Sequence, residues 1–410
     1  DYTVKHVMNI TDVGQLTSDA DDGDDKMVKG LKREGKPQTL EAMSELGEFY
    51  TEKFIDDLKS LNIELPHEMP RASKHIQEDA DLIQILLEKD IAYNTSDGVY
   101  FDVSKFPDYG TRGGFKLGDL KEGVRVAINA EKHTPRDFAL WKFSTGPIGW
   151  DAPFGRGFPG WHIECSAMSR KYLDQPFDIH TGGIDHIPVH HQNEIAQSEA
   201  AYGVPLANVW MHNAYLIFGK EKMAKSGKDV VTMKILQDHG IHPISYRYFL
   251  LQAHYRSPVN FSWEALQAAQ TAYLKLLVGF SALDASFASV IPATEQQRSS
   301  RRLSGIQEFI GDDLNTSDIL ASVWRLLKEK NRVSILDSDR ILGLDIENQS
   351  KRFAEEMNAV PEEIKKLASA REDARKAKDF KKSDELRDQI QKEGFEVMDT
   401  DSDPIVRKKL

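Results

Sequence analysis

Cysteine is nearly missing from this chain, since only one of its 410 residues, Cys165, is a cysteine. A single cysteine cannot close an internal disulfide, which excludes the disulfide-rich secreted scaffolds and is typical of a reducing cytosol. The sequence also lacks an uninterrupted apolar run long enough to cross a membrane. Its first residues, DYTVKHVMNITDVG, lack the charged region and apolar stretch of a signal peptide. We therefore expect a cytoplasmic protein that does not enter a membrane.

Excess positive charge is missing as well. The chain holds 53 Lys and Arg against 65 Asp and Glu, which gives a net charge of −12. This balance argues against a protein whose whole surface binds nucleic acid. The acidic excess lies entirely in residues 1–350, because residues 351–410 contain 15 basic and 15 acidic side chains. The C-terminal region can therefore still meet phosphates locally.

Hydrophobic periodicity indicates an α/β region followed by an all-α region. Helical spacing covers residues 38–60, 76–90 and 189–203, the last ending at Gly203. Strand-like patterns cover the first residues and residues 98–106, 123–130, 176–180 and 213–218, with a glycine-rich connector at 109–119 and a tight turn at 181–185. Beyond residue 232 nearly every segment has helical spacing, and the last such stretch is bounded by Pro361 and Gly394. This order favours segregated domains.

The predicted helix 189–203 places His190 and Glu194 four residues apart, so that both side chains project from one face. With Cys165 they offer one sulfur, one nitrogen and one oxygen donor, a set that suits Zn²⁺. On spacing alone, a surface His–Glu pair beside an unrelated buried cysteine is the more common explanation. The neighbouring His186 and His191 add potential ligands and leave the choice of His190 open.

Two further stretches carry groups that could bind a nucleotide. Lys222 and Lys225 of KMAKS follow a predicted strand, where two ammonium groups on a loop can close on a triphosphate. Many lysine-rich surface loops have a similar sequence without this function. In the turn 181–185, glycines at 182 and 183 allow a planar ring to approach the backbone, and Asp185 could accept hydrogen bonds from ribose hydroxyls.

Six stretches taken together resemble the cysteinyl-tRNA synthetases, a family of class I aminoacyl-tRNA synthetases: NITDV, RDFALWKF, WDAPFGRGFPGWHIECSAMS, DIHTGGIDHIPVHHQNEIAQSEA, WMHNAYLIFGKEKMAKSGKD and DDLNTSD. The resemblance runs from the first residue nearly to the last, and GWHIECS with HHQNE is specific to this family among class I synthetases. It implies ATP-dependent activation of L-cysteine to cysteinyl-adenylate and transfer of the cysteinyl group to tRNA(Cys). ATP with Mg²⁺, L-cysteine and the tRNA are the implied substrates, and a cytoplasmic monomer is the implied state.

The resemblance also implies roles for single residues. Cys165, His190 and Glu194 match the family's zinc ligands, one Zn²⁺ per chain that recognises the substrate thiol. Trp161 and Thr11 match residues that line the cysteine pocket. The implied catalytic residues are Lys225 and, secondarily, Lys222, which match the loop that binds the ATP phosphates. Gly182, Gly183, Asp185 and Lys225 are the residues expected to bind ATP.

The implied architecture is a Rossmann-like catalytic domain with a connective insertion, followed by a helical bundle and a small anticodon-binding region. The expected regions are 1–75 and 148–218 for the two halves of the catalytic domain, 76–147 for the insertion, 219–245 for the signature loop and stem contacts, 246–350 for the bundle and 351–410 for anticodon binding. Family members begin with Cys-Gly-Pro-Thr and His-Ile-Gly-His motifs, which this sequence lacks. We therefore expect an N-terminally incomplete catalytic domain with impaired activity.

Two other functions stay open beside the synthetase. A cysteine ligase of the mycothiol pathway resembles the same catalytic core, but the long helical region after residue 246 suits a tRNA better than a small amino sugar. A non-catalytic tRNA-binding protein derived from a synthetase has no need of zinc ligands and a lysine loop. Cysteine-dependent acylation of tRNA separates these alternatives from the synthetase.

Overall fold

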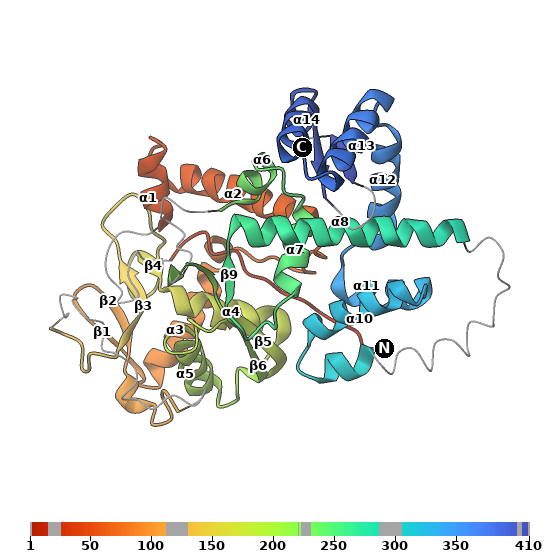
Figure 1. The fold of residues 1–410 in the computed structure, drawn as a ribbon. Helices are drawn as coiled ribbons and strands as arrows, with labels where there is room; N and C mark the ends of the chain where they lie inside the picture. The colour runs from red at the N-terminus through yellow and green to blue at the C-terminus, as the bar shows by residue number, and fades with distance from the viewer. Residues whose placement is uncertain are drawn as a thin grey trace. The chain divides into compact units, whose positions relative to one another are not determined.

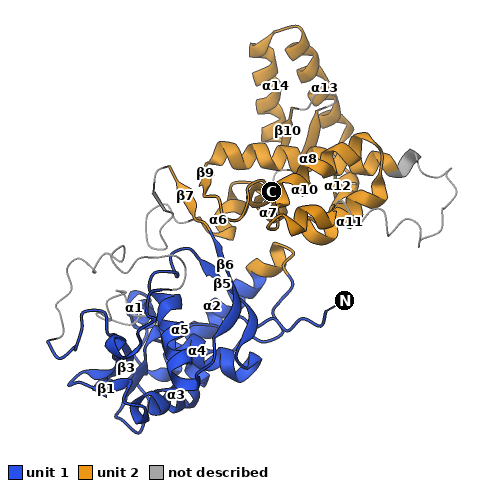
Figure 2. Cartoon of the chain, turned by 90° about the horizontal axis from the view of Figure 1, so that it is seen from below, with its two compact units in different colours: residues 1–56, 64–213 blue, residues 57–63, 214–410 orange. Residues whose placement is uncertain are grey.

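The computed structural model describes residues 2–14, 26–111, 130–219, 221–222, 231–286, 306–399 and 404–408. The chain divides into two compact units, residues 1–56 with 64–213 (unit 1) and residues 57–63 with 214–410 (unit 2), coloured separately in Figure 2. Within the described part of the chain, no helix is both long and apolar enough to span a membrane. The six regions expected from the sequence remain predictions, since the two units do not separate them.

Unit 1 contains a four-stranded antiparallel sheet in the order β1-β2-β3-β4 (Figure 1). The strands are β1 Ala92–Asn94, β2 Gly98–Phe101, β3 Phe138–Phe143 and β4 Gly157–Pro159. All residues of β2 and the first four of β3 are buried, so both faces of the sheet are covered. Helices α3 Ile76–Glu88, α4 Trp161–Leu173 and α5 His190–Tyr202 share its core. The strand predicted at 98–106 is shorter than expected, because η2 Val103–Lys105 follows it as a 3₁₀ turn.

A second, parallel pair of strands in unit 1 joins β5 Phe177–Gly183 to β6 Ala207–Asn213 through α5. The tight turn predicted at 181–185 is wrong in its position, because β5 stays paired with β6 as far as Gly183, which lies opposite Asn213. The predicted helix 189–203 is confirmed, since α5 ends at Gly203. Gly203 has a φ of 70°, a left-handed conformation that glycine adopts without steric cost.

The N-terminal segment of unit 1 is extended, but it is not the strand that its sequence suggests. It forms only two isolated parallel bridges, from Val7 to Glu68 and from Ile10 to Arg71. Helices α1 Lys26–Arg33 and α2 Leu40–Ser60 follow, and α2 and α3 confirm the helices expected at 38–60 and 76–90. The short 3₁₀ helix η1 Ala72–Lys74 precedes α3. The strand predicted at 123–130 lies almost wholly outside the described residues.

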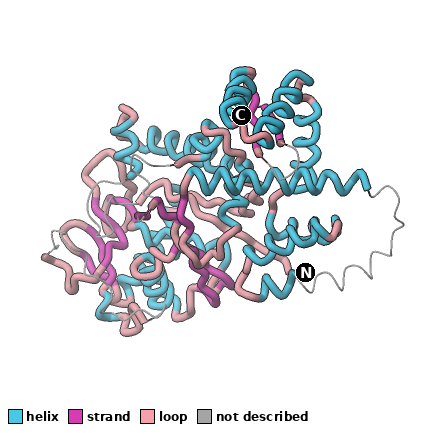
Figure 3. The backbone as a smooth tube through the Cα atoms, in the orientation of Figure 1, coloured by secondary structure: helices cyan, strands magenta, loops and turns pink. Residues whose placement is uncertain are grey.

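Unit 2 is mainly helical, as the sequence beyond residue 232 predicts (Figure 3). Its helices are α6 Met233–Asp238, α7 Pro243–Leu251, α8 Trp263–Ser286, α10 Thr316–Lys328, α11 Arg332–Leu342, α12 Ile346–Asn358, α13 Glu362–Lys376 and α14 Phe380–Lys392. Its strands are β7 Leu216–Phe218, β8 Glu221–Lys222 and β9 Val259–Phe261 in one sheet, and β10 Phe395–Met398 with β11 Ile405–Lys408 in a hairpin. Of the strand predicted at 213–218, residues 216–218 form β7.

One helical prediction in unit 2 needs correction. The stretch between Pro361 and Gly394 forms two helices rather than one, because Lys378 has a φ of 61° and Asp379 caps a new helix. The Asp379 side chain accepts a hydrogen bond from the amide of Lys382, which satisfies a free N–H of the first turn of α14. The α/β region followed by a mainly helical region is therefore confirmed, with small β elements inside the helical part.

Candidate functional site

Helices α4 and α5 of unit 1 bring together the three predicted zinc ligands. Cys165 lies in the second turn of α4, while His190 opens α5 and Glu194 follows one turn later. One ligand atom from each residue lies within 4.8 Å of the others. One sulfur, one nitrogen and one oxygen at this separation form a donor set that fits Zn²⁺.

Glu194 is the centre of this cluster. Its carboxylate is fully buried, with Oε1 2.8 Å from His190 Nε2 and Oε2 2.9 Å from His180 Nε2. Neither oxygen makes a hydrogen bond of acceptable geometry, although both stand close to imidazole nitrogens. Burial alone would raise the pKa of Glu194, but the charges of His180 and His190 outweigh it and hold the pKa well below the usual range. A buried carboxylate kept ionised beside a thiol is ready to bind a cation.

Cys165 is held from the N-terminal segment. Asn9 Nδ2 donates to Cys165 Sγ at 3.6 Å and to Thr11 Oγ1 at 3.2 Å, so one amide connects two residues singled out from the sequence. Burial raises the pKa of the Cys165 thiol well above its usual value, and the charges of Glu194 and Glu164 add to this. The thiol is therefore protonated at neutral pH until a cation replaces its proton.

Further imidazoles surround the three ligands. His162 Nδ1 lies 2.7 Å from His190 Nδ1, and His191 Nδ1 lies 2.7 Å from His212 Nε2. Burial lowers the pKa of His162 well below its usual value, and burial together with the nearby histidines lowers that of His191 to about 3. His180, His191 and Glu194 also have ligand atoms within 4.8 Å of one another. The geometry thus offers two donor sets that share Glu194, of which only the first contains sulfur.

Trp161 lies over the ligand cluster. Its ring centroid is 4.3 Å from that of His190 and 5.8 Å from that of His186. Both Trp161 and Thr11 are half-buried and lie beside residues that contact the cluster. The structure therefore brings the two expected pocket residues to the expected ligands.

Three of the four predicted ATP-binding residues, Gly182, Gly183 and Asp185, lie at the carboxyl end of β5, which is the edge where ligands bind in open α/β sheets. A Cβ atom at Gly182 would lie 2.7 Å from His191 Cε1 and 2.9 Å from His186 Nδ1, so only glycine fits beneath these rings. Asp185 is exposed, and its Oδ1 would lie 2.3 Å from a Cβ atom at Gly183. The sequence analysis expected a planar ring to approach the backbone at this turn. In the structure, the rings that approach Gly182 are those of His186 and His191.

The lysine loop is the part of the expected site that the structure does not place. The backbone of Lys222 belongs to β8 and pairs with Ile217 of β7. Lys225 and the side chain of Lys222 lie outside the described residues. Their predicted contact with ATP phosphates remains a prediction.

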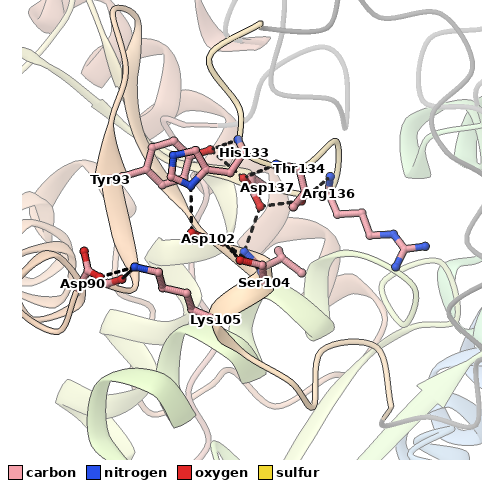
Figure 4. Close-up of polar contacts among 10 residues, drawn as sticks. Asp90, Tyr93, Asp102, Ser104, Lys105, His133, Thr134, Arg136 and Asp137 are labelled. Carbon is pink, nitrogen blue, oxygen red and sulfur yellow. Dashed lines mark hydrogen bonds and ion pairs between the residues drawn. The ribbon is translucent and has the colours of Figure 1, made fainter.

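Another group of potential metal ligands lies between β2 and β3, formed by Asp102, His133 and Asp137 (Figure 4). Here every carboxylate oxygen already accepts a hydrogen bond from the protein. Asp102 accepts hydrogen bonds from the amide and hydroxyl of Ser104 and from the ring of His133. Asp137 accepts from the amide of Val103, from the amide and hydroxyl of Thr134 and from the hydroxyl of Tyr93. The ring of Tyr93 stacks on His133 at 3.8 Å. We interpret this network as structural, since it holds the segment before β3 against β2.

Sequence reasoning missed several residues that the fold brings to the ligands, chiefly Asn9, His162, His180 and His212. Asn9 lies 156 residues before Cys165, and no local pattern connects the two positions. His180 and His212 occupy strands, where a lone histidine carries no spacing signal. The available signals were the histidine-rich stretch that contains residues 180, 186, 190 and 191, and the position of all four missed residues inside the stretches that carry the family resemblance.

Comparisons with known proteins show the family to which the chain belongs. Residues 1–271 match the family model of class I (C) tRNA synthetase catalytic domains, and residues 357–407 match that of the cysteinyl-tRNA ligase anticodon binding domain. A cysteine–tRNA ligase of Burkholderia lata is 42% identical over 415 residues, covering 97% of this chain and 83% of the relative. The Thermus thermophilus ligase is also 42% identical, covering 98% and 86%. That of Treponema denticola is 38% identical, covering 100% and 88%.

Solved structures are similar in fold alone. Methionyl-tRNA synthetase of Mycobacterium tuberculosis bound by methionyl-adenylate has a TM-score of 0.50 at 13% identity, covering 79% of this chain and 73% of that one. The likeness agrees with the class I catalytic fold expected from the sequence.

Proposed function

Because the chain belongs to the cysteinyl-tRNA synthetase family, we propose that it activates L-cysteine with ATP and transfers the cysteinyl group to tRNA(Cys). The observation that carries the proposal is the convergence of Cys165, His190 and Glu194, whose ligand atoms lie within 4.8 Å of one another. A cytoplasmic monomer is the state expected with this function.

We propose that Cys165, His190 and Glu194 hold one Zn²⁺. Their donor set fits the ion, and Glu194 offers two buried oxygens that make no hydrogen bond of good geometry. When bound, the ion would supply a soft Lewis acid that prefers the thiol of cysteine to the hydroxyl of serine. A preference obtained by coordination can exceed the discrimination that a hydrophobic pocket achieves between side chains of similar size.

Around this position the chain's own residues perform the remaining tasks. Asn9 orients the Cys165 sulfur, and Trp161 closes one side of the substrate position with its ring. Gly182 and Gly183 end β5 at the edge where the nucleotide is proposed to bind. Lys222 and Lys225 are proposed to bind the ATP phosphates and stabilise the charge that develops during activation.

The first test measures cysteine binding by the zinc-loaded chain with isothermal titration calorimetry, with serine as the matched ligand. We expect binding of cysteine and no measurable binding of serine, and we expect Glu194→Gln to remove both the zinc and the selectivity. Equal binding of the two amino acids by the zinc-loaded chain would overturn the proposed specificity.

The second test separates the synthetase from the two alternatives. ATP–pyrophosphate exchange with cysteine measures activation, and acylation of bulk tRNA measures transfer. Acylation of an amino sugar instead of tRNA would identify the small-molecule ligase. Binding of tRNA(Cys) without cysteine binding would identify a tRNA-binding protein that has lost its chemistry.

A further inference from the structure

Glu194 belongs to two donor sets, and the proposed function uses only one of them. His180, His191 and Glu194 form the second set, whose ligand atoms lie within 4.8 Å of one another. His180 comes from β5, while His191 and Glu194 come from α5. All three residues therefore lie in unit 1 on a strand or a helix, and such elements hold side chains more precisely than loops do.

The atoms of this second set are buried and lack well-aligned partners. His180 Nε2 and Glu194 Oε2 stand 2.9 Å apart, yet neither makes a hydrogen bond of acceptable geometry with any residue that the structure describes. Glu194 is fully buried, and His191 is 2% exposed. Buried polar atoms are nearly always hydrogen-bonded, and a cation bound between them is one explanation of an exception.

The two oxygens of Glu194 face different imidazoles. Oε1 lies 2.8 Å from His190 Nε2 of the first donor set, and Oε2 lies 2.9 Å from His180 Nε2 of the second. A carboxylate with this arrangement can bridge two metal ions, which lie about 3.5–4 Å apart in two-metal sites. Glu194 can therefore serve the second set without leaving the first.

The distances allow an ion to enter the second set with a small movement. With bonds of about 2.0–2.1 Å in a tetrahedral arrangement, the nitrogen and oxygen donors of one zinc ion lie about 3.3 Å apart. The present separation of 2.9 Å between His180 Nε2 and Glu194 Oε2 therefore has to grow by about 0.4 Å, which a small rotation of either side chain achieves.

His191 is held in place by another imidazole. Its Nδ1 lies 2.7 Å from His212 Nε2, and its ring centroid lies 4.9 Å from that of His180. Histidines that bind metals are commonly oriented in this way, by a hydrogen bond at one ring nitrogen that fixes the ring and its tautomer. The second set therefore has an oriented ligand as well as unsatisfied ones.

The chemistry of the donors distinguishes the two sets. The first contains the Cys165 sulfur, a soft ligand, whereas the second offers two imidazoles and one carboxylate, which suit a borderline divalent ion such as Zn²⁺. Because the second set has no sulfur and shares Glu194 with the first, we expect it to hold its ion less tightly.

We propose that His180, His191 and Glu194 bind a second divalent transition-metal ion, with Zn²⁺ as the probe. Glu194 bridges this ion to the one held by the first donor set. The inference goes beyond the proposed function, which uses one ion, and it raises the expected zinc content at saturation from one ion to two per chain.

The test counts the zinc bound by the full chain after equilibrium dialysis against a series of free zinc concentrations. His180→Asn removes a ligand of the second set alone, and Cys165→Ser removes a ligand of the first set alone. His162→Asn is the matched control, because its ring lies beside His190 but belongs to neither set. Thermal unfolding verifies that each variant is folded.

We expect two ions in the parent chain and in His162→Asn, and one ion in each of the other two variants. One ion in the parent would overturn the second site and leave the proposed function in place. Two ions in His180→Asn would place the second ion elsewhere on the chain, which also overturns the proposal. A parent that binds no zinc would overturn both the second site and the proposed zinc site.

Co²⁺ in place of zinc distinguishes the two sites in the parent chain itself. A bond between Co²⁺ and a thiolate gives a charge-transfer band in the near ultraviolet, and the soft Cys165 set should fill first. The second equivalent should then add absorption in the visible region without increasing the thiolate band. Saturation of both signals at one equivalent would overturn the second site.

Discussion

Asn9 offers a specific test of the metal centre, because it contacts Cys165 but cannot itself replace any of the three donors. Substitution Asn9→Ala removes the amide that donates to Cys165 Sγ at 3.6 Å. This hydrogen bond favours the thiolate, and without it the pKa of the Cys165 thiol is expected to rise further. Zinc then competes less well with the proton, and the affinity falls while the donor set stays complete.

The size of the effect follows from the contact. Hydrogen bonds to charged groups contribute about 1.5–3 kcal/mol, and a separation of 3.6 Å places this one at the weak end of that range. Since about 1.4 kcal/mol corresponds to a factor of ten, Asn9→Ala should bind zinc roughly tenfold more weakly. This is also the lower end of the loss found when residues that orient metal ligands are replaced, about 10- to 100-fold.

The assay is competition for zinc against a chelator of known affinity at fixed pH. Thr11→Val is the matched control, because it removes the second acceptor of the same Asn9 amide, 3.2 Å away, and leaves the amide itself in place. A change of less than about twofold in Asn9→Ala, or an equal change in Thr11→Val, would refute the assigned role of Asn9.

Four further outcomes are expected. The logarithm of the apparent zinc affinity should rise by about one per pH unit between about pH 6 and 8 in chelator competition, because zinc replaces the proton of the Cys165 thiol, whose pKa is raised by burial. His242 has a folded pKa of about 4, below the value of about 6.5 in an unfolded chain, so its contribution to stability is present above about pH 6.5 and lost as the pH falls towards 4. The free energy of unfolding measured with urea should therefore fall by roughly 3 kcal/mol between pH 7 and pH 4, and His242→Asn should reduce this fall. Tyr93→Phe should lower the free energy of unfolding by about 1 kcal/mol in urea titrations, because the hydroxyl both donates to Asp137 and accepts from the amide of His133. Gly182→Ala should destabilise the chain by about 1–3 kcal/mol in the same assay, since the new Cβ would overlap the His191 ring; an unchanged midpoint would contradict the packing described.

The helices and the three proposed ligands were accessible from the sequence because their signals are local. The apolar spacing of α2 and α3 gave both helices, and the four-residue spacing of His190 and Glu194 gave their common face. Cys165, which no spacing connects to α5, joined them as the sulfur donor of a possible zinc set, and the family resemblance then assigned all three as ligands. Whether these residues bind zinc stays a prediction, although their ligand atoms are close together.

Other features depended on contacts that no local pattern reports. The strand β5 extends through Gly182 and Gly183 because it pairs with β6, and pairing overrides the preference of two glycines for a turn. The break between α13 and α14 occurs at Lys378, a residue that ordinarily favours a helix, and the only local signal is the capping residue Asp379. Asn9 reaches Cys165 only because the N-terminal segment packs beside α4 in the folded chain.

Because the chain has a single cysteine, thiol labelling can report on the state of the proposed metal site. Cys165 is half-buried and is the only thiol in the chain, so any reaction with a thiol reagent can be assigned to one atom without preparing a background variant. Its high pKa leaves little thiolate to react in the metal-free protein at neutral pH, so alkylation should be slow there and should accelerate as the pH rises. The rate of labelling therefore follows the state of this one sulfur through metal loading, substrate binding and unfolding.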